Sequence, residues 1–596
     1  MRPITPLVAS DFHGRVQNMI QRFEVNIDGA WVNITGYESV TPIDPDVVNT
    51  NLVVHDMTHA HTANNVILFY NTAGVVYAAS CSLADVQAAI TAADPCDTVM
   101  VPAGSATWAS ALLVDKPLLL IGAGIGQTII THSGLGISAA GEDGFPLAIA
   151  HMTLVKTGSS ASIRITGNCK NFRIHHIAID NQAYTAYVVF EIGAQTGWDY
   201  TSGLIDNCVL PDSRILIMAG NGEGSWKAAT GLGGADAVYI EDCQFYPVSR
   251  TSGNCVDGNN GMRTVVRYNT FEDTYLMTHS LSNGTATSFV RGSRLSEFYN
   301  NTFTAKKVGY SRFYAMRPRA GTGMVFNNQV LSEGGETYSG VTMIDNVRTY
   351  ETKSGLLGRA DGGNIIDMNL PIASGTGEGV HTGANDAATL TCAGKTWTIN
   401  EFAYSPARYY VWNVTDGSRG PITANTADTI TAVLAGGTDN DWDTDDVFLI
   451  SDGYHALDQI GRGQDDGVLS ADPYYQTPRY EDTSRQPQDS EPMYIWNNTR
   501  HGSLANPVVG NGTARHVGID RDFFRQEAAF DGSSGMGVGL RSARPLREDM
   551  SGAPAGVAWW ATDESKLYRW TGTVWVLHYT PYTYPHPLRS DPVLGD

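Results

Sequence analysis

Basic side chains gather in one stretch of this acidic chain, between residues 263 and 319. The stretch contains nine basic and three acidic residues, a net charge of +6, whereas the whole chain carries −22. Arginine presents a planar fork of donors that matches a carboxylate or a sulfate group at two points. The stretch is therefore a candidate binding surface for an acidic ligand. Its basic residues are Arg263, Arg267, Arg291, Arg294, Lys306, Lys307, Arg312, Arg317 and Arg319.

Four residues in or beside this stretch have side chains suited to proton transfer or charge pairing. His279 can carry a proton near neutral pH, and Asp257 lies just before the first arginine-bearing segment. Arg267 is a candidate base or carboxylate clamp, with Glu297 as its neighbour one repeat later. An arginine base needs strong perturbation by nearby charge. The structural alternative is that His279 is a packing residue and that the arginines pair with acids on neighbouring repeats or lie along the surface.

A second polar cluster occupies residues 458–466. Two glycines flank Arg462, so the backbone and the guanidinium group can both approach a ligand. Asp465 and Asp466 are candidate Ca²⁺ ligands, because carboxylates and backbone carbonyls are what this ion binds. The alternative for the two aspartates is a solvated turn.

A short sequence motif recurs along the chain: an apolar strand is followed by Asn or Asp and then by another apolar residue. The steps between copies are 27 to 35 residues, the size of one coil with three short strands and three turns. Asn and Asp tolerate the left-handed backbone of a sharp corner, and stacked amides can bond from coil to coil. We therefore predict an all-β solenoid with an amide ladder, and Cys208 packed beside Cys243 as a free thiol. The predicted column is His176, Asn207, Asp242, Asn269, Asn301 and Asn328.

The apolar spacing over residues 82–93 predicts a helix, with Ser82 as its N-cap. Two segments with the pattern of β-strands follow at 97–104 and 118–124. A helix followed by these segments resembles the first coil of right-handed parallel β-helices of the pectate-lyase-like superfamily, in which the helix caps the open end of the solenoid. The resemblance covers residues 77–596 apart from an insert, and the end of the chain is similar to uncharacterised bacterial and phage tail-spike-like members.

We divide the chain into five predicted segments. Residues 1–76 form a small β module, with a hairpin at 23–34, that is similar to modules at the front of phage tail proteins. Residues 77–373 and 454–525 are the two parts of the solenoid, and 374–453 is a small all-β insert. Residues 526–596 are an aromatic-rich β tail whose proline-rich end is predicted to lie as a strap along the solenoid.

The resemblance implies that a polysaccharide binds along one parallel-sheet face. Related lyases remove a proton beside a uronate carboxylate, often with Ca²⁺, whereas hydrolases use two carboxylates. The sequence departs from characterised pectate lyases in their calcium and catalytic signatures, so cleavage and recognition without cleavage both stay open. The candidate catalytic residues are Arg267, His279, Glu297 and Asp257, and the candidate substrate-binding residues are Arg263, Arg291, Arg294, Arg317, Arg319 and Arg462.

The composition and the termini of the sequence restrict the kinds of partner and the cellular location that we expect. The negative net charge argues against binding to nucleic acid or to an anionic membrane. No apolar run reaches the length of a membrane-spanning helix, and residues 1–14 lack the pattern of a secretory signal. The seven cysteines lack metal-ligand spacing, and a bridge between Cys81 and Cys96 stays open. We expect an extracellular or virion-surface protein that is either a tail-spike-like depolymerase or a glycan-recognising fibre or adhesin, and a stable homotrimer would favour the spike.

Overall fold

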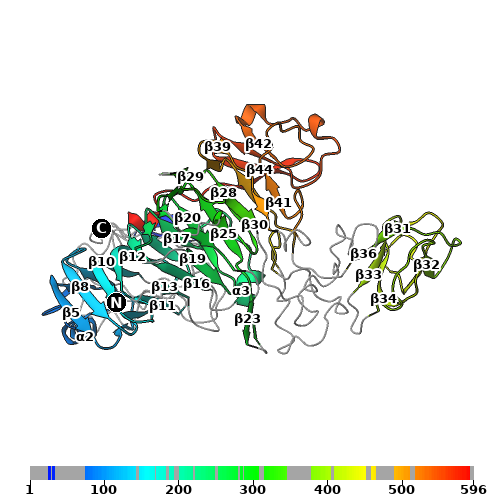
Figure 1. Cartoon of the computed structure of the whole chain (residues 1–596). Coiled ribbons are helices and arrows are strands. Elements are labelled where there is room, and N and C mark those ends of the chain that lie inside the picture. The colour runs from blue at the N-terminus through cyan, green and yellow to red at the C-terminus, as the bar shows by residue number, and fades with distance from the viewer. Residues whose placement is uncertain are drawn as a thin grey trace.

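Short parallel strands are stacked coil upon coil in three rows around one apolar core (Figure 1). The chain is mostly β-structure with long parallel sheets, which agrees with the predicted parallel β-helix. The computed structural model describes residues 24–27, 30–33, 74–141, 146–167, 169–182, 187–193, 201–218, 222–248, 253–279, 282–285, 288–307, 314–333, 335–344, 377–403, 409–435, 437–451, 458–464, 489–510 and 517–590.

We call the three rows the first, second and third faces. The first face is β3 (Val75–Tyr77), β4 (Thr98–Val101), β7 (Leu119–Gly122), β10 (Leu147–Lys156), β12 (Phe172–Asn181), β14 (Gly203–Asp206), β17 (Val238–Glu241), β20 (Arg263–Arg267), β25 (Leu295–Tyr299), β28 (Thr322–Phe326), β37 (Met493–Trp496) and β41 (Phe523–Arg525).

The long strands β10 and β12 turn the corner and continue into the second face. Its other strands are β5 (Gly104–Trp108), β8 (Thr128–His132), β15 (Val209–Pro211), β18 (Gln244–Tyr246), β21 (Thr270–Glu272), β26 (Thr302–Ala305), β29 (Gln329–Ser332) and β38 (Thr499–Arg500), with β39 (Ser503–Leu504) antiparallel to β38. The third face is β6 (Leu112–Val114), β9 (Ile137–Ala140), β11 (Ile163–Thr166), β13 (Val188–Ile192), β16 (Arg214–Met218), β19 (Asn254–Asn259), β22 (Tyr275–Met277), β27 (Tyr314–Arg317), β30 (Gly340–Ile344) and β40 (Val508–Val509).

The predicted capping helix is confirmed as α2 (Leu83–Ala92). The Ser82 hydroxyl accepts a hydrogen bond from the Asp85 N–H at 3.2 Å, which satisfies one of the donors left over at a helix start. Val86 and Ile90 are buried in the same core as the first coils, so the helix covers the open end. A second short helix, α3 (Gly222–Lys227), lies between coils; in the described part of the chain, no helix is long and apolar enough to cross a membrane.

The predicted amide column combines residues from two columns that lie one residue apart in the structure. Its first three members are corner residues, and its last three form the ladder. The register pairs Arg267 with Tyr299, so Tyr268 shares its column with Asn300, and Asn269 with Asn301. One column holds the corner residues, with left-handed φ between 50° and 59°: His151, His176, Asn207, Asp242, Tyr268, Asn300, Asn327 and Asn497. The next column points inward and carries the ladder: Asn269, Asn301, Asn328 and Asn498, preceded by Cys208 and Cys243.

The ladder is continuous over four coils. Asn269 Nδ2 donates to Asn301 Oδ1 at 3.1 Å, Asn301 Nδ2 to Asn328 Oδ1 at 3.0 Å, and Asn328 Nδ2 to Asn498 Oδ1 at 2.8 Å. All seven cysteines are buried free thiols, Cys208 and Cys243 among them, so the packed-thiol prediction is confirmed. Buried amides need partners because an unpaired polar group costs free energy in a low-dielectric core. The ladder supplies those partners and fixes the register of the last coils.

Two further β units stand outside the solenoid core. Residues 377–451 form a six-stranded antiparallel sheet with its own apolar cluster around Trp442 and Phe448. Its strands are β31 (Glu378–Val380), β32 (Thr389–Thr391), β33 (Tyr410–Asn413), β34 (Arg419–Asn425), β35 (Thr429–Ala432) and β36 (Val447–Ser451). Near the N-terminus, β1 (Glu24–Ile27) and β2 (Ala30–Asn33) pair antiparallel where the hairpin was expected. The rest of the predicted N-terminal module, up to residue 73, lies outside the described residues.

The C-terminal unit covers the outer side of the first face. Its sheet is β42 (Met536–Gly539), β43 (Ala558–Ala561), β44 (Lys566–Trp570) and β45 (Trp575–Tyr579), and Trp560 packs on Phe326 and Trp496. The chain then runs back along the first face toward earlier coils, drawn in red in Figure 1. Apolar side chains that face outward from these strands, among them Tyr239, Val265 and Met324, join those of the C-terminal unit in one cluster. Burial of this apolar surface holds the C-terminal unit in place.

Candidate active site

Arg267, predicted as a base or clamp, lies beneath the C-terminal segment. Its Nε donates to Glu241 Oε1 at 2.7 Å, and Nη1 and Nη2 donate to the carbonyls of Tyr582 and Thr583 at 2.6 and 2.7 Å. Nη1 also donates to the Tyr299 hydroxyl at 2.8 Å. The side chains of Arg267 and Glu241 are both fully buried. This geometry makes Arg267 an anchor for the C-terminal segment and leaves it out of reach of a polymer.

Glu297 is enclosed in the same way. It accepts hydrogen bonds from the Gly233 N–H at 2.9 Å and from the Tyr579 hydroxyl at 2.6 Å. Burial raises the pKa of its carboxyl, and these two donors together with Arg267 oppose the rise. Glu297 therefore joins the C-terminal unit to the first face rather than facing solvent.

Three of the predicted substrate-binding arginines form a buried cluster around α3. Arg263 donates to Ser225 and to the carbonyls of Ala228 and Thr230. The guanidinium carbons of Arg291 and Arg294 lie 4.8 and 5.2 Å from the centre of the Trp226 ring, within the range of cation–π contacts.

Both of these arginines also pair with acids from residues 458–491. Arg291 Nη2 lies 2.7 Å from Asp458 Oδ1, and Arg294 Nη1 lies 3.0 Å from Glu491 Oε2. The structural alternative of pairing with acids thus describes Arg291 and Arg294, which join the coils before the insert to the chain that follows it. Arg263 is held instead by Ser225 and by backbone carbonyls beside α3.

The remaining members of the two predicted clusters are dispersed. The backbone of Arg462 forms a β-bridge with Ser490. The pKa of the Asp522 carboxyl is raised by burial, and the charge of Arg462 is one of the influences that oppose the rise. Lys306 pairs with Glu272 at 3.1 Å on the surface. Arg312 and the predicted calcium ligands Asp465 and Asp466 lie outside the described residues.

The structure brings Asp257 and His279 together on the outer side of the third face. Asp257 lies on β19, and His279 follows β22 on the next coil. Asp257 Oδ1 accepts the Gly258 N–H at 2.8 Å and lies 3.1 Å from His279 Nδ1. Asp257 Oδ2 accepts the Asn254 amide at 2.6 Å and lies 3.3 Å from Arg214 Nη1. The carboxylate is thus fixed by donors on both oxygens, and it orients the imidazole.

Cations surround this pair. Arg214 comes from the coil before, where it lies 4.1 Å over the Tyr187 ring. Arg317 lies on the coil after, in register with Met277, and the Arg319 N–H donates to the Thr278 hydroxyl at 3.0 Å. Burial raises the pKa of the Asp257 carboxyl, while Arg214, the two hydrogen bonds and Arg319 oppose it. Three arginines, from the coil before and the coil after, thus lie around the Asp257 carboxyl.

Sequence reasoning found four of these residues, namely Asp257, His279, Arg317 and Arg319, but it missed Arg214 and Asn254. Arg214 lies 43 residues before Asp257 and outside the basic stretch, so composition gave no signal for it. Its only available signal was the coil register, which stacks β16 beside β19.

The arrangement supports general-base chemistry on an acidic substrate. A carboxylate that holds imidazole Nδ1 favours the tautomer whose Nε2 lone pair can accept a proton. Both Asp257 oxygens are engaged by donors, so this carboxylate is unsuited to Ca²⁺. Among the described residues, the two groups with the spacing of metal ligands lie elsewhere, at His151, His175 and His176 and at Asp386, Asp441 and Asp443.

Comparison with known proteins identifies no family for the chain. No protein-family model and no curated protein matches the sequence. Among solved structures, a mannuronic-acid-specific polysaccharide family 6 lyase from human gut microbiota aligns at a TM-score of 0.28 and 14% identity, over 46% of this chain and 80% of that one. A TM-score this low does not establish a shared fold, so the fold assignment depends on the strand pairing of the chain itself.

Proposed function

We propose that the protein binds an acidic polysaccharide on its third face and cleaves it by β-elimination. The contact that carries this proposal is the one between Asp257 Oδ1 and His279 Nδ1, 3.1 Å apart and flanked by arginines. In this assignment His279 is the base and Asp257 is the positioning residue. Arg214 and Arg317, which are half-buried, bind the uronate carboxylate, and buried Arg319 adds positive charge beside Asp257.

Each group has one task in the reaction. The arginines neutralise the carboxylate, which makes the hydrogen on the adjacent carbon more acidic. His279 Nε2 takes that proton, and the electron pair left behind forms a carbon–carbon double bond as the glycosidic carbon–oxygen bond breaks. The departing sugar oxygen takes a proton from solvent. The products are a chain with an unsaturated uronate end and a chain with a new reducing end.

A second candidate is recognition without cleavage, and a groove at the corner between the first and second faces favours it. The groove has a volume of about 480 Å³. The residues that line it are Asn300, Asn327, Asn497, Gln329, Gln526, Thr499 and Leu504, so five side-chain amides border the groove. Paired amide donors and acceptors suit sugar hydroxyls. Under this alternative the solenoid is a stiff rod of a fibre or adhesin.

We also propose that the protein acts outside the cell, on a virion or a cell surface. Its buried free thiols suit folding in a reducing compartment before release. A tail-spike assembly predicts a homotrimer, and light scattering of the purified chain distinguishes a trimer from a monomer.

The deciding experiment is a screen of the full chain against acidic and neutral polysaccharides, following the absorbance of unsaturated uronates and new reducing ends. We expect absorbance to grow on an acidic polymer and to fall at least about 100-fold in His279→Ala. Glu191→Gln is the control, because Glu191 lies on the same face but pairs with Arg164. Reducing ends without absorbance would overturn the lyase assignment, and full activity in His279→Ala would overturn the role of His279 as its base. Binding without cleavage, weakened by Asn327→Gly, would favour the recognition alternative.

A further inference from the structure

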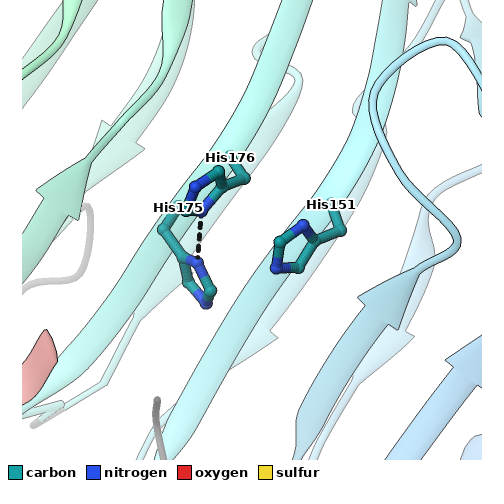
Figure 2. Close-up of side chains that lie close together, drawn as sticks. All are labelled: His151, His175 and His176. Carbon is teal, nitrogen blue, oxygen red and sulfur yellow. Dashed lines mark hydrogen bonds between the residues drawn. The ribbon is translucent and has the colours of Figure 1, made fainter. Parts of the chain in front are cut away.

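Three histidines from two adjacent coils meet at the corner where β10 and β12 bend. His151 lies on β10, and His175 and His176 lie on β12. The parallel register pairs Ala150 with His175 and Met152 with Ile177, so His151 and His176 stand opposite each other across the ladder. Figure 2 shows the three rings turned toward a common space.

The rings are close enough to share one ion. The ring centres of His151 and His176 are 4.7 Å apart and nearly parallel, and His175 stands edge-on at 5.2 Å from each. One ring nitrogen from each residue lies within 4.8 Å of the other two. Tetrahedral zinc with bonds of about 2.0–2.1 Å needs nitrogens roughly 3.4 Å apart. Small side-chain rotations are therefore enough to bring the three nitrogens to one ion.

The protonation state also suits metal binding, because a ligating imidazole must be neutral. His175 Nδ1 lies 2.9 Å from His176 Nδ1, and a hydrogen bond at that distance requires a lone pair on one of the two nitrogens. The ring that accepts this hydrogen bond is therefore neutral.

Charges beside the cluster are balanced, so the neighbouring arginines do not repel a cation outright. Arg173 Nη2 lies 2.9 Å from Asp206 Oδ2. Arg589, from the C-terminal strap, lies 3.3 Å from Asp206 and 3.4 Å from Glu241, and it also contacts Asp242. Each positive charge is thus matched within the network. His175 is buried, and the other two histidines are half-buried.

We propose that His151, His175 and His176 bind one divalent transition-metal ion of the zinc class, with a fourth ligand position open to solvent. Three imidazoles favour zinc, nickel or copper over Ca²⁺ and Mg²⁺, which take oxygen ligands. Because the ligands come from two coils, the ion ties β10 to β12 at the corner. The alternative is that His151 and His176 serve only as corner residues, since histidine is enriched among residues with left-handed backbone.

The fold itself provides substitutions that separate these two roles. Asparagine occupies the same corner at Asn207, Asn300 and Asn327, so His151→Asn and His176→Asn remove a ligand and keep a suitable corner residue. His501 has the same left-handed conformation, with φ of 51°, and lies outside the cluster. His501→Asn is therefore a matched control for the substitution and for the loss of one histidine.

The test uses the full chain after chelator treatment, titrated with Zn²⁺ in equilibrium dialysis and with Co²⁺ by visible absorption. We expect one tightly bound ion per chain and the ligand-field bands of tetrahedral Co²⁺ in the unchanged protein and in His501→Asn. His151→Asn and His176→Asn should bind at least about 100-fold more weakly, and Zn²⁺ should raise Tm only where the three histidines are present. Absence of the Co²⁺ bands, or equal affinity in His176→Asn and the unchanged protein, would overturn the proposal.

Discussion

Arg267 and Glu241 lie on adjacent coils and form an ion pair that the C-terminal segment closes off from solvent. The guanidinium group also holds that segment, because it donates to the backbone carbonyls of Tyr582 and Thr583. One side chain therefore joins two coils to a stretch of chain more than 300 residues later. This contact explains why a basic stretch in an acidic protein need not form a binding groove.

The first prediction concerns this pair. Arg267→Met should lower the free energy of unfolding by about 3–5 kcal/mol, because it removes the main cationic partner of the buried Glu241 carboxylate and leaves it with Arg589 Nη2 at 3.4 Å and the His586 N–H at 3.2 Å. The same change removes donors from Tyr582 and Thr583, so limited proteolysis should cut the C-terminal segment sooner. Arg541→Met is the control: its pair with Glu564 lies at the surface, where solvent screens it, so its loss should change the unfolding curve little. Unchanged urea unfolding of Arg267→Met would contradict the anchoring role.

The second prediction separates the two asparagine columns. Asn301→Ala should destabilise the solenoid by about 2–4 kcal/mol, because Asn269 and Asn328 each lose a buried partner. Asn300→Gly changes the neighbouring residue but keeps a backbone free to adopt the left-handed φ of 56°, so it should cost less than about 1 kcal/mol. Thermal unfolding of the two variants measures both losses of stability. A larger loss of stability in Asn300→Gly than in Asn301→Ala would reverse our assignment of the columns.

These columns also show how far the sequence alone reaches. Spacing and amide chemistry predicted the parallel coils, the capping helix and the packed thiols of Cys208 and Cys243. They placed the ladder one residue off in the early coils. Asn207 and Asp242 are residue types that suit both the left-handed corner position and a side-chain hydrogen-bond ladder, so the sequence does not distinguish the two columns there. Only the register, which pairs Glu241 with Arg267, assigns Asp242 to the same column as Tyr268.

The candidate site was harder to predict for a different reason. Charge composition counts arginines but does not tell which of them meet acids on other coils. Arg291 pairs with Asp458 across an intervening insert, and no local pattern predicts a contact of that range. The C-terminal unit hides Arg267 and Glu297 through apolar packing that involves Trp560, which the sequence marks only as aromatic. Asp257 and His279 were found because their side chains suit proton transfer and lie in or beside the basic stretch.

The third prediction tests the proposed active site. Asp257→Asn should reduce cleavage of an acidic polysaccharide by about 10²–10⁴-fold, because the amide no longer holds His279 in the tautomer that accepts a proton. The substitution keeps the shape of the side chain, so circular dichroism should be unchanged. If His279 is the base, the loss should appear in kcat more than in KM. Arg317→Met should instead raise KM, and a variant pair with the reverse pattern would contradict the assigned roles.

The fourth prediction uses two tyrosine–glutamate contacts with opposite pKa shifts. Glu297 accepts from Tyr579 in the core, where burial raises the pKa of its carboxyl. Glu564 accepts from Tyr568 at the surface, where that hydrogen bond and Arg541 lower the pKa of its carboxyl. A raised pKa means that the folded protein holds the proton more tightly than the unfolded chain, and a lowered pKa means the reverse.

The sign of the pH dependence follows for each glutamate. The stability linked to protonated Glu297 is complete below the unfolded pKa of about 4.3 and is lost as the pH rises through the higher folded pKa. Glu297→Gln cannot ionise, so its free energy of unfolding relative to the unchanged protein should increase as the pH rises through that window. Glu564 contributes stability above its unfolded pKa and loses it as the pH falls, so Glu564→Gln should show the opposite slope. Urea unfolding from about pH 2 to pH 8 covers the window below the unfolded pKa for Glu564 and the window above it for Glu297, and equal slopes would mean that Glu297 is ionised in the folded protein without cost.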